Sequence, residues 1–336
     1  MSDSLSLSVE NDWVRQQAVR IIPQLHATDF DLKEISRGIG HVRHYKLTTR
    51  DKTYFIRVVD TPGDSGLERS ILDHLVAAGA KISPIVYSLT EKAPDSDILL
   101  RLDIRPFIED FTFFATTDED LRRTATELKT IHAALKSFPL RNQVKTAAIT
   151  RSARLANCIA TISEVMRDGK WSRFGELESW ARAHRSWLEK LCTEFDPFLH
   201  HAADAQILHG DVHPGNILFC GSSRDPVFID FEHSIYTFAP CNWDLAYLFQ
   251  RFCLHDKPDA KLLAHRRDIV ESAYGQSLEE LPRFMRATSR LCVCILFNAW
   301  FEKNIPVPPE ELEKFLYLEE QATNLQESWR KISVTP

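Results

Sequence analysis

The sequence predicts an α+β protein in two parts, a β-rich N-terminal part followed by a mostly helical C-terminal part. Runs of alternating apolar and β-branched residues occupy 31–59 and 85–104, which is typical of strands. Beyond residue 110 the apolar residues recur at helical spacing instead. One β-rich segment, at 217–231, interrupts these helices. The length of 336 residues suits two domains or lobes.

The N-terminal part is expected to open with a short helix over 13–25 and to continue as strands. Between the third and fourth strands, Leu67, Ile71 and Leu75 stand at helical spacing and predict a helix over 67–78. Gly79 is placed to end that helix. The strands are predicted, in chain order, over 31–36, 42–49, 53–59, 85–89 and 98–104.

The C-terminal part shows apolar residues at helical spacing in several separate segments. We expect helices over 118–138, 177–191, 259–274, 282–302 and 309–331. The change of pattern places the boundary after residue 108. An N-terminal lobe would then span 1–108 and a C-terminal lobe 109–336. Ligands often bind in a crevice between such units.

Composition excludes several classes of protein. The 41 basic and 47 acidic residues give a net charge of −6, and no Lys/Arg block of a general nucleic-acid binder is present. The N-terminus lacks a signal-peptide pattern, and the longest strongly apolar run, 291–297, is too short to span a bilayer. Seven cysteines without a CxxC pair indicate reduced thiols. We expect a cytoplasmic protein without nucleic-acid or membrane partners, and we leave its oligomeric state open.

Two sequence blocks carry the residues that point to chemistry. The first reads ILHGDVHPGNIL over 207–218, and the second reads VFIDFE over 227–232. Asn216 follows Asp211 by five residues, the spacing of the kinase catalytic loop. Phosphoryl transfer needs a carboxylate near the acceptor hydroxyl and oxygen ligands for Mg²⁺. A hairpin turning at 221–223 would bring Asp230 beside the first block. One block alone would also suit a turn Asp and a capping Asn, but two blocks in this order disfavour that interpretation.

These blocks, together with Asn242-Trp243-Asp244-Leu245-Ala246, resemble the aminoglycoside phosphotransferase and choline kinase superfamily. The resemblance implies a bilobal, protein-kinase-like fold, ATP and Mg²⁺ as cofactors, and transfer to a hydroxyl group. By that resemblance Asp211 is the catalytic base, and Asn216 and Asp230 are metal ligands. Residues that would support the catalytic loop rather than touch substrate are His209, His213 and Asp244.

The N-terminal part matches the kinase pattern less completely, both in its glycine loop and in its phosphate-binding cation. Gly38 and Gly40 lie between two strands, in either the loop that covers ATP phosphates or an ordinary hairpin turn, and Arg43 takes the third glycine position. Arg57 stands on the strand where protein kinases carry a phosphate-binding Lys. Arginine keeps its charge and can bind phosphate through two N–H groups. Glu68 is either the partner of Arg57 or a solvated surface residue.

The strand over 98–104 leads into the segment that would contact adenine. Phe107 and Ile108 are the expected hinge residues, although Phe107 is equally suited to the core.

The acceptor is expected under the C-terminal helices, facing the catalytic loop. Aromatic faces with nearby carboxylates would suit an ammonium group. Trp300 and Phe301 are either part of such a cage or part of the core. The principal candidates are Glu232, Tyr236, Trp243 and Trp300, accompanied by Tyr247, Asn298, Phe301 and Glu302.

Three functions are compatible with these residues. The favoured one is an ATP- and Mg²⁺-dependent kinase that phosphorylates a hydroxyl of a small molecule, an amino alcohol or related metabolite, as choline and ethanolamine kinases do. The second is an aminoglycoside-type antibiotic phosphotransferase, which would need a larger acidic cleft, or a Ser/Thr protein kinase of the same lineage. The third is a nucleotide-binding pseudokinase or scaffold. The incomplete glycine loop and Arg57 favour the third, whereas intact Asp211, Asn216 and Asp230 oppose it more strongly.

Overall fold

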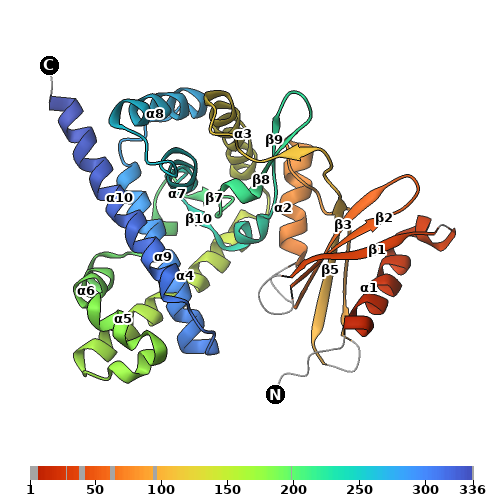
Figure 1. Ribbon diagram of the computed structural model, residues 1–336, viewed down its shortest axis with the longest axis horizontal. Helices are drawn as coiled ribbons and strands as arrows, with labels where there is room; N and C mark the ends of the chain where they lie inside the picture. Colours follow the sequence, from red (N-terminus) through yellow and green to blue (C-terminus); the bar gives the residue numbers. More distant parts are fainter. Residues whose placement is uncertain are drawn as a thin grey trace. The chain divides into compact units, whose positions relative to one another are not determined.

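The computed structural model describes residues 7–27, 29–37, 42–60, 65–93, 97–197 and 199–334. The chain divides into two compact units. The first comprises Met1–Thr112 and Leu218–Glu232, and the second comprises Phe113–Ile217 and His233–Pro336. The first is built on an antiparallel sheet and the second is mostly helical (Figure 1), so the predicted α+β class is confirmed. The predicted lobe boundary after residue 108 stays a prediction.

The first unit contains a five-stranded antiparallel sheet in the order β1-β2-β3-β5-β4. All five predicted strands are present, although the fourth begins two residues later than expected. A short 3₁₀ turn, η1, covers Pro23–Ala27. The strands are β1 (Asp31–Arg37), β2 (Arg43–Thr48), β3 (Thr53–Asp60), β4 (Tyr87–Lys92) and β5 (Leu99–Pro106).

Helices α1 (Leu7–Ile21) and α2 (Ser65–Ala77) cover opposite faces of this sheet (Figure 1). Successive residues of a strand point to opposite faces. On β5, Leu102 joins the apolar core that contains Val14 of α1. The neighbouring Arg101 and Arg105 point the other way and bond Glu68 of α2. One face is therefore apolar, whereas the other carries a buried ionic cluster.

A three-stranded sheet completes the first unit, in the order β6-β8-β9. The predicted β-rich segment forms the hairpin of β8 (Ile217–Cys220) and β9 (Asp225–Phe228), and β6 covers Phe111–Thr112. The backbone N–H of Phe228 donates to Lys81 at 2.9 Å, which ties β9 to the segment after α2.

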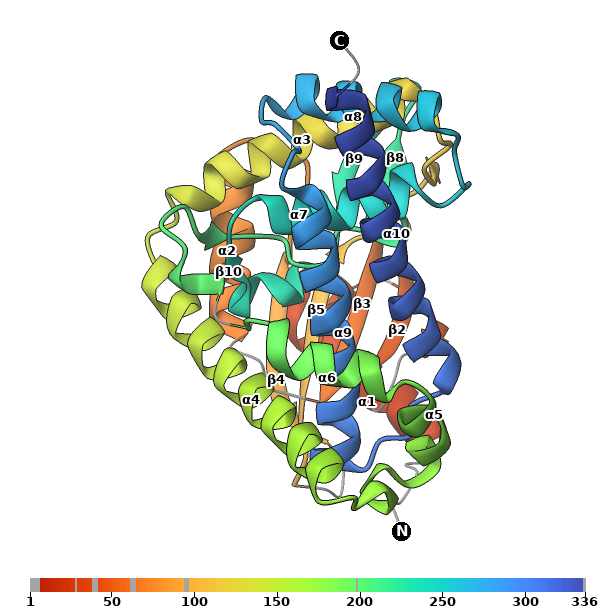
Figure 2. The ribbon, with the colours of Figure 1, turned by 90° about the vertical axis from the view of Figure 1, so that its left-hand side faces the viewer.

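The second unit holds the helices predicted from apolar spacing, a short helix at 242–248 outside those segments, and one long helix that was not expected. The helix predicted over 177–191 is two helices that meet at His184. Helix α10 runs along α9 (Figures 1 and 2), and the short strands β7 (Gln206–Ile207) and β10 (Phe238–Ala239) pair. The unexpected helix is α4 (Arg141–Arg167); the others are α3 (Asp118–Lys136), α5 (Glu178–Ala183), α6 (Arg185–Glu194), α7 (Asn242–Leu248), α8 (Ala260–Tyr274), α9 (Leu281–Lys303) and α10 (Pro309–Val334).

Short helical turns connect these helices. Four of them are 3₁₀ turns, namely η2 (Trp171–Leu177), η3 (Leu199–His201), η4 (Pro214–Asn216) and η5 (Phe231–Tyr236). A π-helical turn, η6 (Phe249–Cys253), follows α7 directly.

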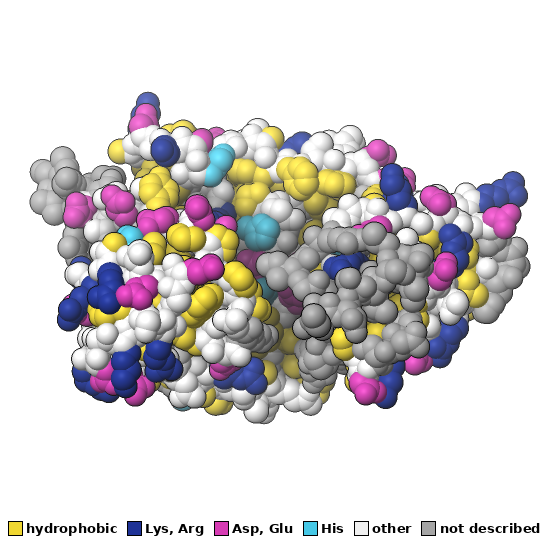
Figure 3. Space-filling model, turned by 60° about the horizontal axis from the view of Figure 1, so that its bottom comes forward, with side chains coloured by type: hydrophobic (Ala, Val, Ile, Leu, Met, Phe, Trp, Pro, Cys, Tyr) yellow, Lys and Arg dark blue, Asp and Glu magenta, His cyan; other side chains and the backbone are white. Residues whose placement is uncertain are grey.

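No helix within the described residues combines the length and apolarity needed to cross a membrane. On the face drawn in Figure 3, Lys/Arg and Asp/Glu side chains are interspersed, and the described part of that face gathers no basic stripe.

Candidate active site

The loop that carries Asp211 is held in place by the carboxylate of Asp244. Asp244 lies in the first turn of α7 and is fully buried. Its oxygens accept the backbone N–H groups of His209 at 2.8 Å and of Gly210 at 2.9 Å. Such charge-assisted bonds are among the strongest in proteins. Gly210 has φ +86°, and a Cβ there would lie 2.5 Å from Thr237 Oγ1, so the loop needs glycine at this turn.

A buried histidine stands behind Asp244. Nε2 of His132, on α3, lies 2.9 Å from Asp244 Oδ2, and its Nδ1 lies 2.7 Å from the hydroxyl of Tyr274. Burial would lower the pKa of His132, but the hydrogen bonds and charges of Asp244 and Cys241 raise it to about 9. The imidazole is therefore protonated at neutral pH, and its positive charge balances the buried carboxylate that fixes the loop.

Asp211 sits among histidines. Its backbone N–H donates to His209 Nδ1 at 3.3 Å, and its Oδ2 lies 3.5 Å from His213 Nε2. Burial would raise the pKa of Asp211, but the hydrogen bond from His213 and the nearby charge of His233 lower it to about 2. His213 also accepts the N–H of Gly215 at 3.0 Å, which caps η4. Asp211 is therefore an ionised carboxylate at any physiological pH.

Asn216 is joined to Asp211 by its amide nitrogen. Nδ2 donates to the backbone oxygen of Asp211 at 3.0 Å and to its Oδ2 at 3.2 Å. These two bonds fix the plane of the buried side-chain amide. Within the described residues Oδ1 accepts no hydrogen bond, so this oxygen is available to a hard cation.

In the first unit, Arg57 pairs with two carboxylates of the second sequence block. Its Nη1 lies 3.3 Å from Asp230 Oδ1, and its Nη2 donates to Glu232 Oε2. Burial would lower the pKa of Arg57, but Asp230 and Glu232 raise it. Asp230 has φ +62°, a left-handed conformation that is uncommon for a residue with a side chain and that often marks functional sites.

The expected pairing of Arg57 with Glu68 is corrected by the structure. The carboxylate of Glu68 is 1% exposed and accepts from Arg101 Nη2 at 2.7 Å and from Arg105 Nη2 at 3.1 Å. Arg57 lies one strand away, on β3, and bonds Asp230 and Glu232 instead. Glu68 is therefore an internal counter-ion of β5.

Comparison with known proteins identifies the chain. A family model described as a phosphotransferase enzyme family matches residues 31–286. The chain belongs to this family. The resemblance drawn from the sequence blocks is thereby confirmed, and the protein is a phosphotransferase. No curated protein matches the sequence.

Solved structures share the fold of this phosphotransferase at low sequence identity. A microcompartment-associated aminopropanol kinase is 15% identical, with 95% of this chain and 98% of that chain covered and a TM-score of 0.55. An ethanolamine kinase from Plasmodium vivax is 15% identical over 92% and 87%, with a TM-score of 0.54. A thermostable mutant of an aminoglycoside phosphotransferase, in complex with ADP and hygromycin B, is 12% identical over 95% and 98%, with a TM-score of 0.54. These likenesses confirm the kinase-like fold.

The remaining nucleotide candidates lie in or beside the first sheet. The backbone N–H of Phe107 donates to Thr53 at 3.0 Å and extends the pairing of β5 with β3. Its ring lies under Lys46, whose Nζ is 4.5 Å from the ring centroid. Ile108 is half-buried beside it. Gly38 and Gly40 lie outside the described residues, so the glycine loop stays a prediction.

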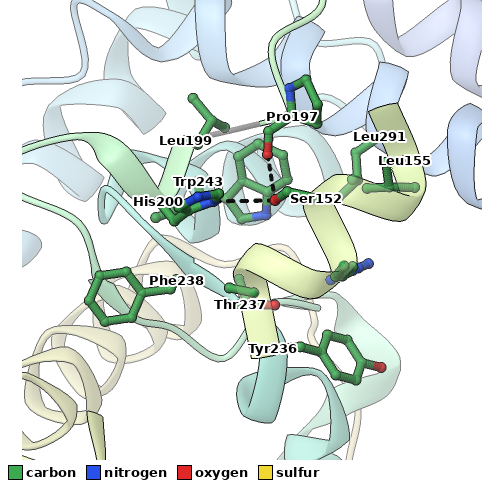
Figure 4. Close-up of a pocket in the computed structure, with 13 residues that line it drawn as sticks. Ser152, Leu155, Pro197, Leu199, His200, Tyr236, Thr237, Phe238, Trp243 and Leu291 are labelled. Carbon is green, nitrogen blue, oxygen red and sulfur yellow. Dashed lines mark hydrogen bonds between the residues drawn. The ribbon is translucent and has the colours of Figure 1, made fainter. Parts of the chain in front are cut away.

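Two of the acceptor candidates line one pocket of the second unit. Tyr236 and Trp243 belong to a pocket of about 390 Å³, including its open mouth (Figure 4). Trp300 is not among its lining residues and donates its indole N–H to Arg173 at 3.2 Å. Glu232 belongs to the first unit, where it bonds Arg57.

Sequence reasoning missed the residues that complete this pocket. Arg151 and Ser152 come from α4, and His200 comes from η3. Ser152 Oγ donates to the Pro197 carbonyl at 2.8 Å and lies 3.2 Å from His200 Nδ1 (Figure 4). The available signal was charge, because α4 carries four cations before its first acidic residue, Glu164.

Proposed function

We propose that this phosphotransferase moves the γ-phosphoryl group of ATP to a hydroxyl of a small molecule, an amino alcohol or related metabolite. The observation that carries the proposal is the coupling of Asp211 to Asn216. One loop presents an ionised carboxylate for the acceptor hydroxyl and, on an immobilised amide, an oxygen for a cation. A binding module would not need that carboxylate. Structural neighbours named as aminopropanol and ethanolamine kinases support the class of acceptor.

Asp211 would accept a hydrogen bond from the acceptor hydroxyl and aim its oxygen at the γ-phosphorus. Transition states of phosphoryl transfer are loose, so positioning and electrostatics contribute more than strong base catalysis. A carboxylate whose pKa is about 2 suits this role, because it stays ionised and takes the proton late. Asp244, His209 and His213 would act as positioning residues that hold the loop.

The donor set fits Mg²⁺. The carbonyl oxygen of Asn216 and the carboxylate of Asp230 are hard oxygen ligands, which Mg²⁺ prefers. When bound, Mg²⁺ neutralises charge on the nucleotide phosphates. Arg57 would hold the Asp230 carboxylate and bind phosphate through its guanidinium fork.

The nucleotide would be contacted by the glycine loop and the hinge. We assign the loop to Gly38 and Gly40 and the hinge to Phe107 and Ile108. Glu68 would contribute indirectly, by holding the arginines of β5.

The proposal is tested by ADP release with Mg·ATP and a panel of choline, ethanolamine, 3-aminopropanol, L-homoserine and hygromycin B. Asp211→Asn should lower acceptor-dependent kcat by about 10²–10⁴-fold, the usual range for a group positioned at the reacting proton. Its ATP affinity, measured by titration, should stay close to wild type. Asn216→Ala should instead raise the Mg²⁺ concentration needed for half-maximal rate.

The matched control is Asp204→Asn, because Asp204 is an exposed carboxylate near the loop in sequence. It should behave as wild type. Undiminished turnover by Asp211→Asn would refute the assigned role. Turnover that is rapid only with hygromycin B would identify an antibiotic, and not an amino alcohol, as the acceptor.

A further inference from the structure

The pocket lined by Tyr236 and Trp243 shares a wall with the catalytic loop. The carbonyl of Thr237, a lining residue, accepts the N–H of Leu208 at 3.2 Å. The side chain of Thr237 fills the space that the absent Cβ of Gly210 leaves open. A ligand in this pocket is therefore packed against the segment that leads into the catalytic carboxylate.

The walls of this pocket carry positive charge. Arg151 lines it, and among the described lining residues none is Asp or Glu. His200, also a lining residue, adds no charge at neutral pH, because burial and the neighbouring His201 and Lys145 lower its pKa. An ammonium group placed here would meet a guanidinium without a carboxylate on the wall to balance it.

Arg151 is held by an aromatic ring rather than by an acid. Its guanidinium carbon stands 4.6 Å from the ring centroid of Tyr236, a cation–π contact that occupies one face of that ring. Arg182, by contrast, pairs along its own helix with Glu178 at 2.8 Å. Within the described part of the chain, Arg151 has no carboxylate within ion-pair distance. Its N–H donors can therefore bind an anion from outside.

The rest of α4 strengthens this charge. Its cations Arg141, Lys145, Arg151 and Arg154 all precede the first acid of the helix, Glu164. Of these, Arg141 lies in the first turn, where the helix end carries partial positive charge and a cation reduces helix stability. Arg141 and Lys145 also stand 5.8 Å from the ring of Phe238, another lining residue. Together these cations make the pocket attractive to an anion.

Arg151 also lies within electrostatic reach of the catalytic loop. The hydroxyl of the buried Tyr247 is 3.5 Å from Cys292 Sγ. Burial and Cys292 raise the pKa of Tyr247; Asp211 raises it further, whereas Arg151 lowers it. Both charges therefore act on one hydroxyl in the same unit.

We infer that the acceptor of this phosphotransferase carries a carboxylate near the hydroxyl that is phosphorylated, and that Arg151 binds this carboxylate. The inference rests on the proposed function and narrows it, from an amino alcohol to one that bears an acid, such as a hydroxy amino acid. A guanidinium forms two parallel N–H···O bonds with a carboxylate. The ring of Tyr236 keeps the guanidinium plane fixed for that purpose. Arg151 is thus assigned as the specificity-determining residue.

The test uses pairs of compounds that differ by the acid alone. L-Homoserine is compared with 3-aminopropanol and D-glycerate with ethylene glycol, and glycerol 3-phosphate forms a separate phosphate arm. Affinities are measured calorimetrically on the full-length wild type, Arg151→Gln and Arg154→Gln. Arg154 lies on the same helix but is exposed and does not line the pocket. In the wild type and Arg154→Gln, at least one acid should bind about 10–100-fold tighter than its partner, as expected for hydrogen bonds to a charged group. Arg151→Gln should lose that advantage.

Several results would overturn the inference. These are equal or weaker binding of every acid, an acid advantage that survives in Arg151→Gln, and an advantage confined to the phosphate arm. Turnover of the same pairs separates this inference from the proposed function. Rapid phosphorylation of 3-aminopropanol without preference for L-homoserine would refute the role of Arg151 but leave the proposed kinase function standing. Acids that bind through Arg151 but are never phosphorylated would support the ligand class and count against the kinase assignment.

Discussion

The buried pair of His132 and Asp244 should make the stability of the second unit depend on pH. The two side chains are 3% and 0% exposed and lie 2.9 Å apart. Replacing His132 by Gln keeps a group that can donate to Asp244 but removes the titratable charge. The substitution therefore tests the protonation of His132 and not only its packing.

The sign and size follow from the pKa. The pKa of His132 rises from its ordinary 6.5 to about 9 in the folded protein, because the hydrogen bonds and charges of Asp244 and Cys241 together outweigh the effect of burial. A raised pKa gives stability that is fully present below about pH 6.5 and is lost as pH rises through about 9. The difference of about 2.5 pKa units corresponds to roughly 3 kcal/mol in the free energy of unfolding. Most of it should be gone at pH 9.

A neighbouring thiol titrates in the opposite sense. Burial would raise the pKa of Cys241, but His132 and Tyr274 lower it. A lowered pKa contributes stability that is lost as pH falls, which would mask part of the histidine effect. The comparison is therefore made both with and without Cys241→Ala, since the same thiol also raises the pKa of His132.

The assay is urea unfolding at pH 6, 7, 8 and 9 of the wild type and of Cys241→Ala, each with and without His132→Gln. In the wild type, the destabilisation caused by His132→Gln should shrink by roughly 3 kcal/mol between pH 6 and pH 9. In Cys241→Ala it should shrink by less, because the thiol no longer raises the pKa of His132. His265→Gln is the matched control, because His265 pairs with Asp118 at 2.6 Å on the surface. Its effect should stay within about 1 kcal/mol throughout. A His132→Gln effect that is equally large at all four pH values would show that the folded-state pKa is not raised.

Two further substitutions test the loop and the ionic cluster. Gly210→Ala should lower the free energy of unfolding by about 1–3 kcal/mol and reduce turnover, since its Cβ would collide with Thr237. Gly79→Ala is the control, because Gly79 has a similar φ of +79° but its Cβ would meet open space. This control should lower the free energy of unfolding only by the cost of the left-handed backbone conformation. If both substitutions lower the free energy of unfolding in urea by the same amount, the collision with Thr237 is excluded. Glu68→Gln should destabilise by about 3–5 kcal/mol by leaving two buried arginines underpaired, whereas a change below about 1 kcal/mol would mean that water replaces the carboxylate.

The features that the sequence predicted are those that local patterns specify. The strands follow from alternation, and the motif around Asp211 and Asn216 follows from spacing within one loop. Helix α4 was missed because small or polar residues, such as Ala148 and Ser152, interrupt the row of buried apolar side chains that includes Val144 and Leu155. Such a segment has a weak apolar stripe, so only its packing in the second unit reveals it as a helix.

Side-chain partners were the less predictable part of the site. Glu68 and Arg57 were expected to pair because both resemble kinase positions, but the register of β5 brings two arginines to the carboxylate first. His132 reaches Asp244 across 112 residues of chain, and no local pattern encodes that contact. Charges that meet through tertiary packing must be read from the structure, whereas the identity of the reacting carboxylate can be read from the sequence.

The two proposals about the acceptor side are linked by electrostatics. Asp211 is ionised at neutral pH, so an acceptor that also carries a carboxylate brings a second negative charge towards it. Coulomb repulsion between like charges in a partly buried site opposes that approach. Arg151 supplies the opposite charge in the pocket that adjoins the loop, and the described lining residues add no acid that would cancel it. A neutral or cationic alcohol would need no such residue, because the negative charge of Asp211 would attract a cation by itself. An acidic acceptor therefore explains why the pocket is lined by Arg151, a cation that has no carboxylate partner among the described residues.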